Sequence, residues 1–148
     1  MTTIDPSGPP PAPPTVNGVS HLPPHVQRAL ARPHRIDITT TGRQSGQPRR
    51  IELVFHVIDG RIIISGMPGR RDWYANLVAD PVMTFHLTGP VQADLPSLAR
   101  PITEPTERRQ IMEAVTRNWN AEDRFDTFYR HSPLIEVTFP ATPVAGAA

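Results

Sequence analysis

The alternation of apolar and polar residues is clearest between residues 50 and 58, where it predicts a half-buried β-strand. The apolar side chains of this strand would share one face: Ile51, Leu53, Phe55 and Val57. Asp59-Gly60 follows directly, and this dipeptide favours the tight turn of a β-hairpin. The apolar run at 61–66 therefore predicts the second strand of a hairpin.

Five further stretches have the composition of strands. They are residues 35–41, 82–88, 91–95, 98–103 and 134–139. Pro96 and Pro101 indicate sheet edges or bulges, because proline cannot donate a hydrogen bond to a neighbouring strand. The strands follow one another too closely for parallel crossover connections. The pattern therefore predicts a mainly β protein, a small closed or split antiparallel β-barrel with α insertions.

Helical signals lie between these strands. Residues 24–32 predict a short helix that begins at a proline. Asp72 is positioned to cap a second helix, which Pro81 ends. The spacing of apolar residues predicts two more helices, at 105–119 and 122–130. The expected barrel therefore carries a few short peripheral helices.

The chain has 148 residues, enough for one domain with a substantial core. The sequence predicts a disordered proline-rich tail over residues 1–24, a folded domain over 25–140 and a flexible tail over 141–148. No secretory signal pattern and no apolar run of membrane-spanning length is present. The chain has no cysteine, which excludes disulfides and thiolate chemistry. We expect a cytoplasmic protein without stable membrane insertion.

The net charge is only +1, but the charges are unevenly distributed. Residues 35–71 contain seven arginines and three acids, whereas residues 72–148 contain six arginines and ten acids. The basic half includes the loop 39–50, with the sequence TTTGRQSGQPRR. Such an excess of positive charge favours an anionic partner.

The glycines and arginines of this loop give it a specific chemistry. Gly42 and Gly46 permit backbone conformations that bring several N–H groups close to a bound anion. Arg43, Arg49 and Arg50 can form forked hydrogen bonds with phosphate or carboxylate. An anion-binding loop and a solvated basic turn are both compatible with this composition.

A second arginine-rich segment precedes the helix expected near Asp72. The first N–H groups of that helix would face an anion, assisted by Arg70 and Arg71, and Trp73 would pack beside a planar ring. Both segments follow the ends of strands, so we expect them to converge on one cleft.

Other chemistries lack support in the sequence. His56 and His86 lie on polar strand faces, and His56 is close enough in sequence to pair with Glu52, but the histidine spacings match no metal motif. The serines lack the nucleophile elbow of hydrolases. The glycines match neither a Walker loop nor a dinucleotide fingerprint. A net charge near zero and few aromatic residues argue against nucleic-acid binding.

Two motifs resemble those of a known family. Thr39 to Arg49, followed by a hairpin and then by RDWYANLVADP at residues 71–81, is similar to the deazaflavin-dependent nitroreductase family of split β-barrel flavin and deazaflavin oxidoreductases. The resemblance covers residues 36–139. It implies an actinobacterial enzyme that transfers a hydride from reduced coenzyme F-420, with FMN as the alternative cofactor, to a small hydrophobic acceptor such as a quinone, an enone or a nitro compound.

The resemblance also implies roles for particular residues. The phosphate and glutamyl tail of the coenzyme would be held by Arg43, Gln44, Ser45 and Arg49. The ring system would lie along Arg50, Ile51, Glu52, Leu53 and Val54, and beside Ser65 and Gly66. The helix that closes the site would contribute Trp73, Tyr74 and Asn76. Ser65 and Tyr74 are the candidate catalytic residues, as proton donors, and no metal is implied.

The chain departs from the family pattern at two places. Gln44 stands where the family often has lysine, and Val54 stands where reductases often have an aromatic residue. The cofactor half of the site is therefore better defined than the acceptor half. The alternative functions are a non-catalytic barrel that binds FMN, haem or a fatty acyl ligand, and a dimeric interaction module. The resemblance also implies a possible homodimer.

Overall fold

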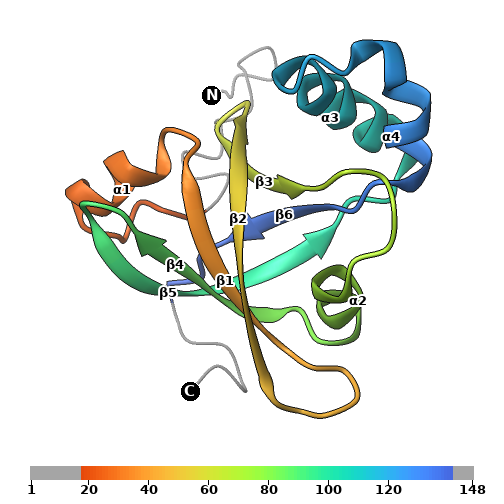
Figure 1. Ribbon diagram of the computed structural model, residues 1–148. Helices are drawn as coiled ribbons and strands as arrows, with labels where there is room; N and C mark the ends of the chain where they lie inside the picture. The colour runs from red at the N-terminus through yellow and green to blue at the C-terminus, as the bar shows by residue number, and fades with distance from the viewer. Residues whose placement is uncertain (1–17, 142–148) are drawn as a thin grey trace, which may run out of the picture.

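The computed structural model describes residues 18–141, and within this range six antiparallel strands close into a barrel (Figure 1). The strands are β1 (Arg35–Thr41), β2 (Pro48–Ile58), β3 (Arg61–Ser65), β4 (Val82–Thr88), β5 (Gln92–Pro101) and β6 (Leu134–Thr138). Their order around the barrel is β1-β2-β3-β6-β5-β4. The expected mainly β fold with a small antiparallel barrel is confirmed.

The helices of the described range lie outside the barrel (Figure 1). They are α1 (Pro24–Leu30), α2 (Asp72–Ala79), α3 (Pro105–Asn118), the 3-10 turn η1 (Glu122–Arg124) and α4 (Phe125–His131). α3 and α4 pack together at one end, whereas α2 lies beside the loop that joins β1 and β2. The loop ends at Gln47, and α2 begins 25 residues later at Asp72. The barrel therefore brings two distant segments of the chain together.

The main core fills the barrel and is built by the alternation seen in the sequence. Ile38 on β1 lies opposite Ile51 on β2 and Phe85 on β4. Phe85 makes edge-to-face contacts with Phe55 and Phe139, with ring centroids 5.5 and 5.4 Å apart. A second cluster under α3 and α4 includes Met112 and Phe128, both fully buried.

The hairpin between β2 and β3 has the expected turn. Asp59 and Gly60 adopt positive φ values of 53° and 75°. Two successive residues with positive φ form the turn whose twist matches that of paired strands, and aspartate followed by glycine suits it.

The structure corrects the prediction of two strands at 91–95 and 98–103. A single strand, β5, runs from Gln92 to Pro101 and includes Pro96. Pro96 is tolerated because this half of the strand pairs only with β4, and pairing with β6 begins at Leu98. Pro96 therefore lies in the part of β5 that has a neighbouring strand on one side only, and it does not end the strand.

The predicted tails lie partly outside the described residues, which leave out 1–17 and 142–148. Residues 18–24 fall within the segment expected to be a tail, but Val19 and Leu22 pack against the barrel core. Gly18 approaches Phe139 so closely that a Cβ would lie 2.7 Å from the Phe139 carbonyl oxygen. α1 then ends at Leu30, two residues before its expected end.

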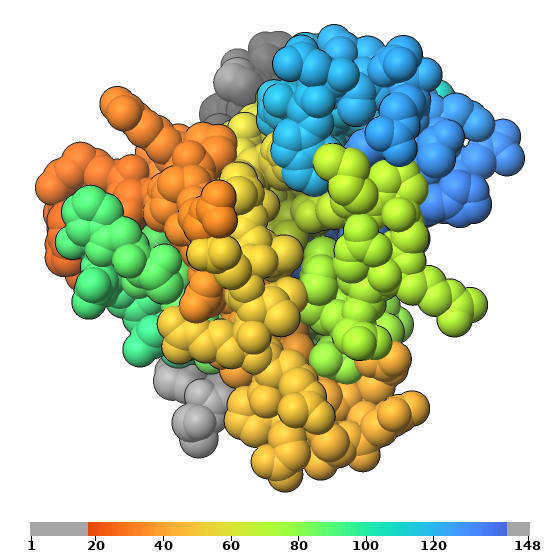
Figure 2. Space-filling model, in the orientation of Figure 1, coloured from red at the N-terminus to blue at the C-terminus, as the bar shows by residue number. Residues whose placement is uncertain are grey.

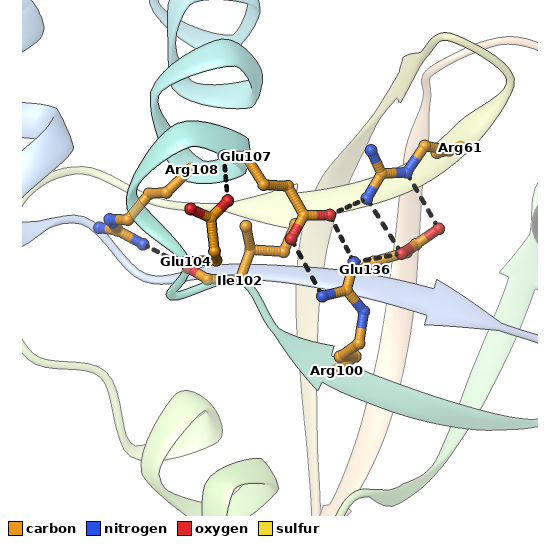
Figure 3. A network of polar contacts seen from close by, with 7 residues as sticks. All are labelled: Arg61, Arg100, Ile102, Glu104, Glu107, Arg108 and Glu136. Atoms are coloured by element: carbon orange, nitrogen blue, oxygen red, sulfur yellow. Dashed lines mark hydrogen bonds and ion pairs between the residues drawn. The ribbon is translucent and has the colours of Figure 1, made fainter.

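Four charged residues form a network that joins α3 to the barrel (Figure 3). Arg61 on β3 and Arg100 on β5 both contact Glu107 on α3 and Glu136 on β6, at 2.6 to 3.1 Å. Glu104 caps α3 by accepting hydrogen bonds from the backbone of Glu107 and of Thr106. The network is far from the β1–β2 loop, so these arginines are structural.

We predict that Glu107→Gln lowers the free energy of unfolding by roughly 2 kcal/mol at pH 7, because hydrogen bonds between charged groups are lost. Hydrogen bonds from Arg100, and then from Arg61, hold the pKa of Glu107 at about 2, below its ordinary 4.5, although burial opposes them. The unfolded chain therefore binds more protons between these values, and stability falls as the pH falls from 4.5 towards 2. Urea unfolding at several pH values should show that the free energy of unfolding of Glu107→Gln falls less steeply than that of the wild type as the pH is lowered from 4.5 towards 2.

The control is Glu113→Gln, which removes a carboxylate from the same helix at an exposed position without a side-chain ion pair in the described residues. This variant should unfold as the wild type does. If both variants lower the free energy of unfolding equally, the charged network is not the source of the stability lost in Glu107→Gln.

Candidate functional site

A cleft of about 350 Å³ lies between the β1–β2 loop and α2. The loop contributes Gly42, Arg43, Gln44, Ser45 and Arg49. The helix contributes Asp72, Trp73 and Asn76, and the barrel strands contribute Thr40 and Ile51. Figure 2 shows the surface hollowed between the yellow β2 and the lime segment that contains α2. Most of the residues expected to hold the coenzyme's anionic groups therefore line one cleft.

The loop closes on itself through backbone hydrogen bonds. The N–H of Gly42 donates to the Gln47 carbonyl at 2.8 Å, and the N–H of Gly46 donates to the Gly42 carbonyl at 2.8 Å. The Gln47 N–H donates to Ser45 Oγ at 3.1 Å. A Cβ on Gly42 would lie 2.5 Å from Ser45 Oγ, so a larger residue there would displace the Ser45 hydroxyl. The N–H groups of Gly42, Gly46 and Gln47 are therefore used to close the loop and are not directed at a ligand.

Asn76 fixes the loop to α2. Its Oδ1 accepts hydrogen bonds from the Arg43 backbone N–H at 3.1 Å and from Arg43 Nη1 at 2.9 Å. Its Nδ2 donates to Thr40 Oγ1 on β1 at 3.1 Å. Asn76 is only 3% exposed, so these bonds satisfy a buried amide and also position the guanidinium group of Arg43.

Asp72 has a different role from the one predicted. It is the first residue of α2 and does not cap the helix, because the residue at the N-cap is Arg71. Its carboxylate pairs with Arg43 Nη2 at 3.3 Å, and its side chain is largely exposed. The positive charge of Arg43 is therefore partly offset inside the cleft.

Arg49 is the uncompensated cation of the cleft. Its only polar side-chain contact among residues 18–141 is a 3.5 Å approach to Ser45 Oγ, and no carboxylate lies within ion-pair distance. A guanidinium group offers five donors, so nearly all of its hydrogen-bonding capacity faces the solvent of the cleft.

Arg50 and Glu52 lie on the opposite face of β2. Arg50 Nε contacts Asp37 at 2.9 Å, and Glu52 contacts Arg35 at 3.2 Å. This follows from the period of two along a strand, since Arg49 and Ile51 face the cleft. The structure thus separates the two adjacent arginines, and the Arg50 guanidinium does not reach the cleft. Of the remaining expected residues on this strand, Leu53 packs against the core and Val54 is exposed.

The two candidate proton donors lie apart from the cleft. Ser65 is buried, and its hydroxyl donates to the Pro133 carbonyl at 2.6 Å. Tyr74 lines a second cavity of about 560 Å³, between the loop after β3 and the end of α4. A Cβ on Gly66 would lie 3.3 Å from Pro133 Cγ.

The two histidines expected on polar strand faces are both largely buried. His56 lies under α3, 3.1 Å from the amide of Asn118, and burial lowers its pKa to about 4. It contacts α3 and makes no bond with Glu52. His86 is hydrogen-bonded to Thr39 at 2.7 Å and to Asp94 at 2.6 Å. Within residues 18–141, no three histidine or acidic side chains are grouped closely enough to hold a metal ion.

Sequence reasoning missed three features of the site. Thr40 and Asp72 contribute to the cleft, and the second cavity was not expected. Thr40 could have been found from the alternation in β1, since it lies on the same face as Ile36 and Ile38.

No helix in the described residues is long and apolar enough to cross a membrane.

The closed antiparallel barrel has the fold of the split-barrel flavin and deazaflavin oxidoreductases, and an arginine-lined cleft lies beside it. Residues 23–135 match the family described as F420H(2)-dependent quinone reductase, and the chain belongs to this family. It is therefore a deazaflavin-dependent oxidoreductase whose coenzyme is F-420.

Solved structures share the fold at low sequence identity. The F420-H2-dependent reductase FDR-A is 22% identical, with a TM-score of 0.54 over 70% of this chain and 92% of that one. The conserved hypothetical protein Rv2991 from Mycobacterium tuberculosis is 17% identical, with a TM-score of 0.60 over 82% and 91%. A protein described as a domain-swapped dimer is 23% identical, with a TM-score of 0.53 over 70% and 78%.

We predict that Asn76→Leu lowers the free energy of unfolding by about 1–3 kcal/mol, because it leaves polar groups of Arg43 and Thr40 without partners. The measurement is urea unfolding followed by circular dichroism. Gln44→Ala, at an exposed position in the same loop, is the control and should change stability by only a few tenths of a kcal/mol. If Asn76→Leu lowers the free energy of unfolding no more than Gln44→Ala does, the hydrogen bonds of Asn76 do not stabilise the fold.

Proposed function

We propose that the protein reduces a small hydrophobic acceptor, with a quinone as the leading candidate and an enone or nitro compound as the others. The quinone is suggested by the description of the family. The observation that supports coenzyme binding in the cleft is Arg49, a cation that lines it without an acidic partner in the described residues. Family membership supplies the coenzyme, and the cleft supplies the charge that its anionic groups require.

The residues of the cleft fit the phosphate and glutamyl carboxylates of the coenzyme. Arg49 and Arg43 would hold these groups by charge-assisted hydrogen bonds, with Gln44 and Ser45 as neutral donors. Because Asp72 offsets part of the charge of Arg43, Arg49 would contribute the larger share of the binding energy. Gln44, at the position where the family often has lysine, adds no charge.

The reacting ring would lie along β2, where the surface is hollowed between this strand and the segment that contains α2 (Figure 2). The reduced coenzyme supplies a hydride, and the acceptor then needs one proton to complete a two-electron reduction. Trp73 and Ile51, which are apolar and line the cleft, would exclude water from one side. Tyr74 is our proton donor, because the Ser65 hydroxyl hydrogen is already bound to Pro133.

We predict that Arg49→Ala raises the dissociation constant of oxidised coenzyme F-420 roughly 10- to 100-fold, as expected for the loss of a charge-assisted hydrogen bond of roughly 1.5–3 kcal/mol. The measurement is a fluorescence titration of the purified protein. Arg50→Ala removes the neighbouring guanidinium group from the opposite face of the strand, so it should change the constant less than threefold.

Equal effects of the two substitutions would place the coenzyme elsewhere. Failure of the wild type to bind the deazaflavin, together with FMN or haem retained on purification, would favour a non-catalytic ligand-binding barrel.

We predict that Tyr74→Phe lowers kcat roughly 100-fold, the usual scale for loss of a general acid, and leaves the coenzyme dissociation constant unchanged. The substitution keeps the ring and removes only the hydroxyl. Steady-state kinetics with menadione and a coenzyme titration measure the two effects separately. An unchanged kcat in Tyr74→Phe and a large loss in Ser65→Ala would reverse the two assignments.

We also propose that the protein acts as a homodimer in the cytoplasm. The support for a dimer is the similar structure described as a domain-swapped dimer. Light scattering coupled to size-exclusion chromatography gives the mass in solution.

A further inference from the structure

The second cavity is a separate site whose lining has no residue in common with the Arg49 cleft. It has a volume of about 560 Å³ and lies between the loop after β3, α2 and the end of α4. Its polar wall consists of Arg70, Arg71, Tyr74, Arg130 and His131. Ser132 and Pro133 complete the wall on the β6 side.

The wall of this cavity is held in place by hydrogen bonds. The Gly69 N–H donates to the His131 carbonyl at 2.9 Å, which joins the loop to α4. Arg71 donates to the carbonyls of Arg70 and Met67, at 2.8 and 3.0 Å, and so braces the loop from inside. Gly69 has a φ of 129°, a conformation that other residues rarely adopt. The cavity is therefore built by the fold.

The lining of the cavity contains cations but no carboxylate among the described residues. Arg70 is exposed, and its side chain makes no hydrogen bond or ion pair within the described part of the chain. Arg130 pairs with Asp126 at 3.0 Å, but both side chains are more than half exposed, so this pair is weak. The carboxylate of Asp72 is directed to Arg43 and the other cleft.

A half-buried arginine adds positive charge behind the wall. Arg108 on α3 donates to the carbonyls of Ser132 and Tyr129, at 2.6 and 2.8 Å. Burial lowers the pKa of Arg108, and the nearby phenols of Tyr74 and Tyr129 partly offset this effect. An anion in the cavity would thus face cations on the loop, on α4 and behind the wall.

We propose that this cavity binds an anionic group carried by the acceptor, so that the substrate class is a reducible ring with a carboxylate, sulfonate or phosphate substituent. This inference rests on the proposed function, because it assigns the coenzyme to the Arg49 cleft and the acceptor to the side of α2 that carries Tyr74. Arg70 is the residue with donors free to bind the anion. The hydride from the coenzyme and one proton reduce the ring, and the anionic substituent takes no part in the electron transfer.

The experiment compares 1,4-naphthoquinone-2-sulfonate with menadione as acceptors for the wild type, Arg70→Ala and Arg70→Lys at constant ionic strength. We expect Arg70→Ala to lower kcat/KM for the sulfonate roughly tenfold or more relative to menadione, with most of the change in KM. Arg70→Lys should restore part of the loss. Arg28→Ala is the matched control, since it removes an exposed arginine from α1 on the other side of the barrel (Figure 1) and should leave the ratio unchanged.

Coenzyme titrations distinguish failure of this inference from failure of the proposed function. If Arg70→Ala leaves the ratio of kcat/KM for the sulfonate to kcat/KM for menadione unchanged, the inference is overturned. A coenzyme dissociation constant raised as much by Arg70→Ala as by Arg49→Ala would also overturn it, because the cavity would then hold the coenzyme's own anionic tail.

A wild type that binds no coenzyme would refute the proposed function. The cavity is then tested alone by titrating the protein with naphthalene-2-sulfonate and with the neutral naphthalene-2-sulfonamide. Preference for the sulfonate, lost in Arg70→Ala, supports an anion site, and equal binding of the two probes refutes it.

Discussion

The buried side chain of Asn76 is the interaction on which the candidate site depends. Its oxygen accepts from the backbone and the guanidinium group of Arg43, and its nitrogen donates to Thr40, so one residue joins β1, the following loop and α2. A primary amide suits this position because it presents acceptor and donor atoms at the end of one short side chain. The loop closes on itself without Asn76, but only the exposed contacts between Arg43 and Asp72 would then join it to the helix. The positions of the two facing walls of the cleft therefore depend mainly on the buried hydrogen bonds of Asn76.

Positive charge has two distinct uses in this chain, although all of its basic residues are arginines. Arg61 and Arg100 are paired with Glu107 and Glu136, and this network attaches α3 to the barrel (Figure 3). Arg49 lies at the β1–β2 loop without a carboxylate within reach in the described residues. Paired guanidinium groups have little capacity left for a ligand, whereas an unpaired one retains it. The absence of a partner, more than the number of arginines, distinguishes the binding surface from the structural one.

The sequence was sufficient for elements defined by local periodicity, and insufficient where the outcome depends on distant neighbours. The strand at 82–88 and the turn at Asp59-Gly60 were predicted correctly, because alternation and turn chemistry are local. The division of residues 91–103 into two strands was wrong, since the missing neighbour that allows Pro96 inside one strand is a property of the closed barrel. The alternation along β2 also places Arg49 and Arg50 on opposite faces of the strand, although the two were grouped together in the sequence. The cavity beside Tyr74 could not be predicted, because it forms where α4 meets a loop about 60 residues earlier in the chain, with Gly69 bonded to His131.

The position of α2 gives a physical reason why the anionic groups of the proposed coenzyme and acceptor would bind at separate places. Trp73 and Tyr74 are consecutive in the helix, so their side chains leave the axis about 100° apart. Trp73 lines the cleft with Arg49, and Tyr74 lines the cavity with Arg70. Their rings contact each other edge to face, with centroids 6.2 Å apart, so the two proposed anion-binding surfaces meet at the first turn of α2. Each surface has an arginine of its own, so the anionic groups of the two proposed ligands would lie apart while their reacting rings meet beside this turn.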